Sequence, residues 1–297
     1  MKVLITGAAG FLGRQLTEAL QAGHELRLLD NVDPEEATVF QGSEGRKRVP
    51  LRTQWPYVRA DVLDEEAMLA ACEGVDAVIH LAAIPTGYPE QGKAIMQVNA
   101  VGTYVVVDAA RKAGCQRFLC ASSINAFGTI YWRLSGKPVV YETMPLTEDF
   151  RTVEEDPYSL SKRVNEETCA TFNRAYGITT AAFRFAGVWH QGLYEERAGK
   201  LEPTTGWLDD LYNWVHVEDV AHGLKAALEC PTLPGFGVYT LGAADTRAPE
   251  PTMEILRKFR PDLTEHVIEP LEGRAALMSI RKARETFGYD PQYTLMP

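Results

Sequence analysis

The sequence lacks the features of a disulfide-built, basic or membrane-spanning protein. Its five cysteines are an odd number without a CxxC pair, which argues against a disulfide framework and a zinc site and suits a reducing compartment. The formal net charge is −10, so no basic surplus exists for phosphate backbones or anionic lipid. No signal peptide is recognisable, and no uninterrupted apolar run approaches the roughly 18 residues of a membrane helix. We therefore expect a cytoplasmic protein with a small-molecule substrate, no metal, and neither nucleic acid nor membrane as a partner.

Short β-branched runs alternate with amphipathic stretches through the first two thirds of the chain. The pattern predicts strands at residues 2–6, 25–30, 57–61, 77–81, 117–122 and 179–184. Parallel neighbours need crossover helices, and these helices cover both faces of the sheet. The sequence therefore predicts an α/β fold with a doubly wound parallel sheet of the Rossmann type, whose ligand crevice lies at the carboxyl edge.

Two irregular segments interrupt this alternation. Residues 32–56 are polar and rich in glycine, proline and charge, and we expect a surface insertion there. Residues 129–156 mix aromatics with glycine and proline, so they either wall a substrate pocket or form a packed loop. After about Gly187 the alternation fades. We expect a Rossmann domain over residues 1–186 and a small C-terminal substrate lobe over residues 187–297, with elements near 214–242 returning to the first domain.

The first predicted strand runs directly into a glycine-rich turn. Glycines stand at 7, 10 and 13, and the helical pattern begins with Phe11 and Leu12. In this context Gly7 permits the tight turn, Gly10 lets the backbone approach a pyrophosphate, and Gly13 allows close packing of helix on strand. The helix N-terminus offers free N–H groups to the anion. The turn therefore predicts a dinucleotide site.

An acidic residue follows at the end of the second predicted strand. Asp30 stands seventeen residues after Gly13, where a carboxylate accepts hydrogen bonds from a ribose 2′-hydroxyl and repels a 2′-phosphate. This position favours NAD over NADP as the cofactor. The alternative is an aspartate that only begins the next loop.

A tyrosine and a lysine share one face of a later helical pattern. Tyr158 and Lys162 are four residues apart in a helix that we expect to reach about Tyr176. A neighbouring ammonium and the positive nicotinamide both favour the phenolate. Tyr158 could then exchange a proton with a substrate hydroxyl. Taken alone, the pair is more often a solvated helix face.

The motifs together resemble the short-chain dehydrogenase/reductase superfamily, and within it the extended branch, the NAD-dependent epimerase/dehydratase family. Besides the glycine turn and the TyrxxxLys pair, the resemblance rests on residues 80–83 (His-Leu-Ala-Ala), 98–103 (Val-Asn-Ala-Val-Gly-Thr), 122–123 (Ser-Ser), 145–148 (Pro-Leu-Thr-Glu) and 214–221 (Trp-Val-His-Val-Glu-Asp-Val-Ala). It spans roughly residues 1 to 230.

The resemblance implies roles for individual residues. Tyr158 would be the general acid/base, Lys162 would lower its pKa and hold the nicotinamide ribose, and Ser123 would hydrogen-bond the substrate oxygen. The implied cofactor contacts are Gly7, Gly10, Phe11, Leu12, Gly13, Asp30, Asn31, Asp61, Val62, Leu81, Ala82, Ala83, Asn99, Ser122, Tyr158, Lys162 and Phe185. For Asn99 and for residues 81–83 the alternative is capping and core packing.

Departures from the family pattern bear on the substrate. After Arg184 the family's sugar-nucleotide members usually carry Asn-Val-Tyr-Gly-Pro, whereas this chain reads Gly-Val-Trp-His-Gln at 187–191. We therefore expect less space and fewer cations for a diphosphate than in those members. The Asp-Glu pair of the dehydratases is replaced by Ile124 and Asn125, which argues against dehydration. Candidate substrate contacts are Ser123, Asn125, Trp189 and His190; a core position is the alternative for the tryptophan and the histidine.

The sequence thus predicts an NAD-dependent oxidoreductase that transfers hydride between NAD and a carbinol or carbonyl of a sugar, polyol or sugar acid. A nucleotide-sugar 4-epimerase that retains NAD is the alternative, and a non-catalytic dinucleotide sensor is a minor one. The resemblance also implies a homodimer, because residues 96–113 and 158–176 correspond to the two helices that pair in many relatives.

Overall fold

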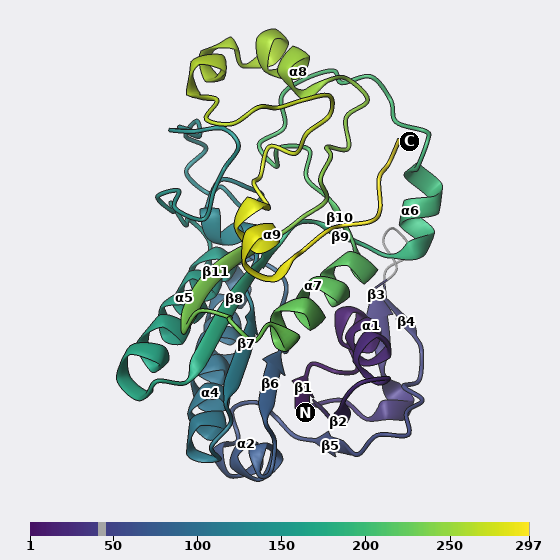
Figure 1. Ribbon diagram of the computed structural model, residues 1–297, viewed down its shortest axis with the longest axis vertical. Helices are drawn as coiled ribbons and strands as arrows, with labels where there is room; N and C mark the ends of the chain where they lie inside the picture. The colour runs from purple at the N-terminus through teal and green to yellow at the C-terminus, as the bar shows by residue number, and fades with distance from the viewer. Residues whose placement is uncertain (41–45, 297) are drawn as a thin grey trace.

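The computed structural model describes residues 1–40 and 46–296. Its centre is a parallel sheet of seven strands in the order β11-β8-β7-β6-β1-β2-β5 (Figure 1). The strands are β1 (Lys2–Thr6), β2 (Glu25–Asp30), β5 (Tyr57–Arg59), β6 (Ala77–His80), β7 (Arg117–Ala121), β8 (Thr179–Phe185) and β11 (Phe236–Leu241). The order reverses direction at β1, so the predicted doubly wound Rossmann sheet is confirmed.

Helices cover both faces of this sheet, as right-handed crossovers require. The α-helices of the whole fold, within the described residues, are α1 (Phe11–Leu20), α2 (Glu65–Cys72), α3 (Gly92–Ile95), α4 (Gly102–Lys112), α5 (Pro157–Tyr176), α6 (Gln191–Arg197), α7 (Val217–Glu229), α8 (Thr252–Phe259) and α9 (Arg281–Phe287). In β1, Val3 and Ile5 pack toward α1 and α7, whereas Leu4 packs toward α2 and α4. The central strands β1 and β6 are buried on both sides and therefore read as apolar runs.

Helix α5 begins and ends at sequence signals. The Asp156 carboxylate accepts hydrogen bonds from the backbone N–H groups of Tyr158 and Ser159, at 2.9 and 3.0 Å. Pro157 occupies the first turn, and Gly177 ends the helix in the left-handed conformation at φ 74°. Because the cap is fixed, Tyr158 lies in the first turn of a rigid helix.

The insertion predicted at residues 32–56 is anchored to the core. It contains the short antiparallel pair β3 (Thr38–Phe40) and β4 (Arg46–Arg48), and residues 41–45 lie outside the described part. Ala37 and Leu51 are buried in the main core. Arg14 of α1 donates its guanidinium to the carbonyl oxygens of Val49 and Pro50. The insertion is therefore packed against the start of α1.

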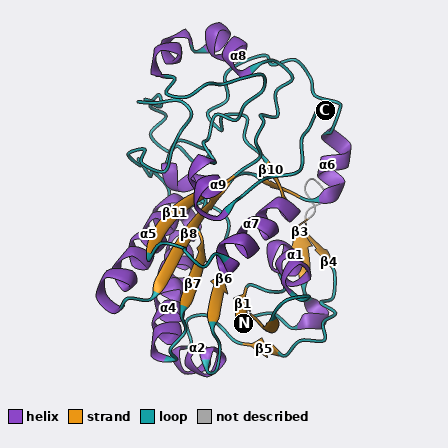
Figure 2. Ribbon diagram, viewed as in Figure 1, coloured by secondary structure: helices purple, strands orange, loops and turns teal. Residues whose placement is uncertain are grey.

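A second apolar cluster lies beyond the carboxyl ends of the strands, in the mostly irregular upper part of Figure 2. It gathers side chains that are far apart in sequence, including Phe127, Tyr141, Tyr212 and Leu256. The pair β9 (Val188–Trp189) and β10 (Val215–His216) joins this region to the sheet. Two elements of the last third of the chain return to the main sheet: α7 packs on one face of it, and β11 is its edge strand.

Candidate active site

The glycine turn has the geometry of a dinucleotide cradle. Gly7 has φ 71°, and a Cβ there would come within 2.7 Å of the backbone nitrogen of Ala82. A Cβ on Gly13 would collide with the backbone of Gly7 and Ala8. Only glycine therefore fits these two positions. The turn lies against Leu81 and Ala82, from the loop after β6.

Helix α1 begins without a side-chain cap at Gly10 and carries no acidic residue in its first turn. The first N–H groups of such a helix need acceptors and favour an anion. Asp30 lies directly beside this turn: its carboxylate accepts from the N–H groups of Ala9 and Asn31, at 3.0 and 2.8 Å. Burial raises the pKa of Asp30, and hydrogen bonds from these backbone groups oppose that rise. The uncapped donors and the adjacent carboxylate fit a dinucleotide.

A buried histidine links strand β1, which leads into the glycine turn, to helix α4. His80, at the end of β6, hydrogen-bonds Thr6 through Nδ1 at 2.7 Å and Thr103 through Nε2 at 3.0 Å. Burial lowers the pKa of His80 to about 3, and the nearby Lys162 ammonium adds to the effect. The imidazole is therefore neutral and structural. It ties β1, β6 and α4 together beneath the site.

Ser123, Tyr158 and Lys162 converge at the carboxyl edge of β7. Lys162 donates from Nζ to the carbonyl oxygen of Ala121 at 2.9 Å, and Nζ lies 5.5 Å from the centre of the Tyr158 ring. Burial lowers the pKa of Lys162 to about 8. Burial raises the pKa of Tyr158 to about 12, and a hydrogen bond with Ser123 partly opposes this. The sequence predicted a phenol shifted toward phenolate; in the protein alone desolvation outweighs the hydrogen bond with Ser123, and the Asp156 carboxylate adds to the rise in the pKa of Tyr158.

Ser122 points away from this cluster. Its hydroxyl donates to the buried Glu166 carboxylate of α5 at 2.7 Å, and Arg184 of β8 pairs with the same carboxylate. Burial raises the pKa of Glu166, but hydrogen bonds from Arg184 and Ser122 outweigh burial, so the pKa is lowered overall. The hydroxyl of Ser122 is thereby engaged in the core, whereas the resemblance implies a cofactor contact for this residue.

The remaining cofactor candidates occupy the same edge of the sheet. Asn99, in the π-helical segment Met96–Val101, holds the backbone of Ile84 through both carboxamide atoms. Asp61 accepts from the N–H of Leu63 at 3.0 Å, and Val62 lies against Gly102. Ala83 is half-buried, and Phe185 is buried at the end of β8. Asn99 therefore shapes the loop after β6 through its backbone.

The substrate candidates divide into two groups. Asn125 lies beside Ser123. Trp189 and His190 make other contacts. Trp189 packs on Trp214. His190 caps α6 by accepting a hydrogen bond from the Leu193 N–H, and its ring meets the Phe11 ring edge-on. Of the four candidates, the described contacts therefore bring only Ser123 and Asn125 together.

Trp132 lines the side of the site at Tyr158. The centres of the two rings are 6.0 Å apart in an edge-to-face arrangement, and the indole also lies against Gly87. Tyr141 and Phe150, from the same irregular segment, are buried in the second apolar cluster. The segment is therefore packed through Tyr141 and Phe150, while Trp132 lies against Tyr158.

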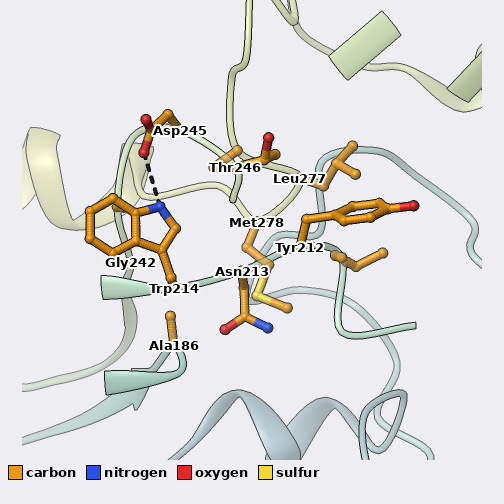
Figure 3. A pocket seen from close by; sticks show the side chains of 12 residues that line it. Ala186, Tyr212, Asn213, Trp214, Gly242, Asp245, Thr246, Leu277 and Met278 are labelled. Atoms are coloured by element: carbon orange, nitrogen blue, oxygen red, sulfur yellow. Dashed lines mark hydrogen bonds between the residues drawn. The ribbon is translucent and has the colours of Figure 1, made fainter. Parts of the chain in front are cut away.

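A small cavity lies in the C-terminal region (Figure 3). Trp214 donates to Asp245 at 3.0 Å on its wall, and the buried hydroxyl of Thr246 has no hydrogen-bond partner among the described residues. The space suits about one water molecule. None of Ser123, Tyr158 and Lys162 lines it, so this cavity is separate from the proposed catalytic cluster.

Within residues 1–40 and 46–296, no helix is both long and apolar enough to cross a membrane. Over the same residues, no group of three or more His, Cys, Asp or Glu side chains is gathered as metal ligands would be.

Fold and site together define a Rossmann-type dinucleotide enzyme, and the sequence profile of the NAD dependent epimerase/dehydratase family matches residues 3–242. The chain belongs to this family, and its cofactor is NAD. It is an NAD-dependent enzyme of the oxidoreductase/epimerase type. The resemblance predicted from the motifs is thereby confirmed.

Three of the curated relatives, at 26–28% identity, are named for different substrates. A 3-beta-hydroxysteroid dehydrogenase of Mycolicibacterium neoaurum is 26% identical over 99% of this chain and 88% of its own length. A uronate dehydrogenase of Pseudomonas putida is 27% identical over 83% and 77%. A UDP-glucose 4-epimerase of Bacillus subtilis is 28% identical over 82% and 77%. The relatives therefore share a family but not a substrate.

Solved structures show the same fold. A UDP-glucose 4-epimerase of Thermotoga maritima with UDP-glucose superposes with a TM-score of 0.69 at 24% identity, covering 99% of this chain and 95% of that one. A UDP-glucose 4-epimerase of Thermus thermophilus in complex with NAD gives 0.67, also at 24% identity and with the same coverage.

Proposed function

We propose that this protein is an NAD-dependent dehydrogenase that oxidises a carbinol of a sugar, polyol or sugar acid, or reduces the matching carbonyl. The observation that carries the proposal is the cluster of Ser123, Tyr158 and Lys162 at the edge of the sheet that carries the glycine turn. We place the substrate between the sheet domain, residues 1–186, and the C-terminal lobe, residues 187–297. The uronate dehydrogenase relative supports this substrate class.

Each residue of the cluster has a separate task. In this proposal the glycine turn and Asp30 hold the dinucleotide, and Lys162 holds its nicotinamide ribose. When bound, NAD supplies the hydride acceptor and a positive charge near the reacting carbon. Ser123 donates to the substrate oxygen, and Tyr158 Oη takes the hydroxyl proton as the carbinol becomes a carbonyl. Trp132 and the cap on α5 fix the position of Tyr158.

NADH formation across a panel of sugars, polyols, uronic acids, sterols and nucleotide sugars tests the proposal. A dehydrogenase releases NADH in proportion to substrate consumed. A 4-epimerase would retain bound NAD and interconvert nucleotide sugars without net NADH. A dinucleotide sensor would bind NAD and turn over nothing in the panel; either of these results would overturn the proposal.

We further propose a homodimer built on α4 and α5. On these helices Tyr104, Leu160 and Tyr176 are each about half exposed, at 54%, 46% and 55%. Exposed aromatic and aliphatic side chains on adjacent helices suit an isologous interface. Size-exclusion chromatography with light scattering should give twice the chain mass at micromolar concentration, and a monomer would contradict the proposal.

We also propose a cytoplasmic location. All five cysteines are free and buried, and unpaired thiols suit a reducing compartment. Subcellular fractionation with an antibody to the protein tests this, and recovery in an oxidising compartment would contradict it.

A further inference from the structure

Asn125 carries a buried polar atom that the folded protein leaves unused. The residue lies in the 3₁₀ segment Ile124–Phe127 directly after β7, and it is 4% exposed. Its side-chain Nδ2 has no hydrogen-bond partner among the described residues. Buried amide donors are nearly always paired, so an unpaired one beside a proposed active site points to a ligand atom.

The carboxamide is held against the proposed catalytic serine. The hydroxyl of Ser123 donates to Asn125 Oδ1 at 3.5 Å, and the backbone N–H of Asn125 donates back to Ser123 Oγ at 3.1 Å. Ser123 also hydrogen-bonds Tyr158. Tyr158, Ser123 and Asn125 therefore form a row of polar groups, with the serine in the middle.

The spacing of this row suggests a second contact with the substrate. In the proposed function, Tyr158 and Ser123 meet the reacting oxygen, so the next donor along the row is the Asn125 carboxamide. Two oxygens on neighbouring carbons in a gauche arrangement lie roughly 3 Å apart, so one of them can meet Ser123 while the other reaches the adjoining Asn125 carboxamide, whose Oδ1 is the atom in contact with Ser123. A single substrate with two adjacent oxygens could therefore satisfy both groups.

We propose that Asn125 Nδ2 donates a hydrogen bond to an oxygen on the carbon next to the reacting one. The substrate is then a vicinal diol, or in the oxidised direction an α-hydroxy carbonyl compound. Sugars, polyols and sugar acids have this arrangement, whereas a carbinol on an otherwise bare ring does not. An isolated carbinol leaves Nδ2 unpaired in the complex and is disfavoured. This inference rests on the proposed function and narrows its substrate class.

Matched pairs of probes test the inference. NADH formation is measured with cyclohexane-1,2-diol against cyclohexanol, and with D-galactose against 2-deoxy-D-galactose, for the wild type and for Asn125→Ala. We expect the wild type to favour the diol by about tenfold in kcat/KM, the equivalent of one good hydrogen bond. In Asn125→Ala the diol value should fall by about tenfold more than the mono-ol value, so that the preference for the diol is lost.

Thr246→Val is the matched control, because it removes a buried unpartnered hydroxyl from the separate cavity of Figure 3. It should keep the wild-type preference, and NAD affinity should be equal in all three proteins. A wild type that oxidises both members of each pair equally, or an Asn125→Ala protein that keeps the preference, overturns this inference alone. Absence of NADH from these probes and from the whole panel described above overturns the proposed function, and the inference with it.

Discussion

The Ser122 hydroxyl donates a 2.7 Å hydrogen bond to the Glu166 carboxylate, which also binds Arg184 at 2.8 and 2.9 Å. This contact ties β7 to α5 and β8. Because α5 carries Tyr158 and Lys162, the buried carboxylate fixes their helix relative to Ser123. Adjacent serines thus have different tasks: one anchors the helix and the other faces the proposed substrate.

Glu166→Gln should therefore destabilise the protein strongly. The substitution leaves the buried Arg184 cation without a counter-ion, and breaking such a pair costs about 3–5 kcal/mol. Urea denaturation followed by tryptophan fluorescence measures the loss. Glu167→Gln, one residue along on the exposed side of α5, is the matched control and should change stability by less than about 1 kcal/mol. Equal losses in both variants would contradict the anchoring role.

Tyr158→Phe should reduce turnover by about 10²–10⁴-fold, because the variant lacks the hydroxyl that exchanges the substrate proton. The phenyl ring keeps its contact with Trp132, so NAD affinity should stay within about twofold of the wild type. NADH formation and titration of NAD by fluorescence quenching measure the two quantities. Undiminished turnover would remove Tyr158 from the mechanism.

Asp30→Ala should weaken NAD binding and relax discrimination against NADP. The wild-type carboxylate stands beside the turn, where it repels a 2′-phosphate and accepts from a ribose hydroxyl. We expect the ratio of kcat/KM for NAD over NADP to fall by about tenfold or more, the equivalent of one charge-assisted hydrogen bond. Asp33→Asn, in the following loop, is the control and should keep the ratio. An unchanged ratio in Asp30→Ala would show that Asp30 does not contact the cofactor.

Gly13→Ala should lower both stability and NAD affinity, because the added Cβ meets the backbone of Gly7 and Ala8 and forces α1 away from the turn. Overpacking of this kind costs about 1–3 kcal/mol. Gly23→Ala is the matched control, since no atom lies within 4 Å of a Cβ at that position. Thermal unfolding with and without NAD measures both effects. A Gly13→Ala protein that binds NAD normally would contradict the assignment of this turn as the dinucleotide site.

His80 predicts a pH dependence of stability. The folded imidazole has its pKa lowered to about 3 by burial, whereas the unfolded one takes up a proton near its ordinary value of about 6.5. Protonation thus favours the unfolded chain as the pH falls below that value, by about 2 kcal/mol at pH 5. In His80→Gln this part of the acid destabilisation should vanish, so the slope of unfolding free energy between pH 7 and 5 should be smaller. An unchanged slope would contradict the buried neutral state.

Much of the fold could be predicted from local pattern. The apolar runs at residues 2–6 and 25–30 coincide with β1 and β2, and the TyrxxxLys helix begins within one residue of its predicted start. These elements are buried on both faces or capped by their own sequence, so neighbouring residues determine them. The glycine turn was equally readable, because its backbone conformation depends on residues within one short stretch.

Contacts between distant residues could not be predicted. Glu166 and Arg184 pair across 18 positions, and the tail after α9 returns to place Tyr293 on His216 with ring centres 3.6 Å apart. The unpaired Nδ2 of Asn125 is visible only once its neighbours are known. A sequence pattern carries no record of which polar atoms remain unsatisfied after packing, and that is the information that bears on the substrate.

The five buried thiols have a practical consequence. They lie on different elements: Cys72 ends α2, Cys120 is in β7 and Cys169 is in α5, while Cys115 and Cys230 follow α4 and α7. A thiol reagent reaches them only when these elements open, so the rate of labelling, resolved by mass spectrometry of each peptide, reports local unfolding. The wild-type chain thus carries its own set of probes for testing where NAD tightens the structure, without an introduced label.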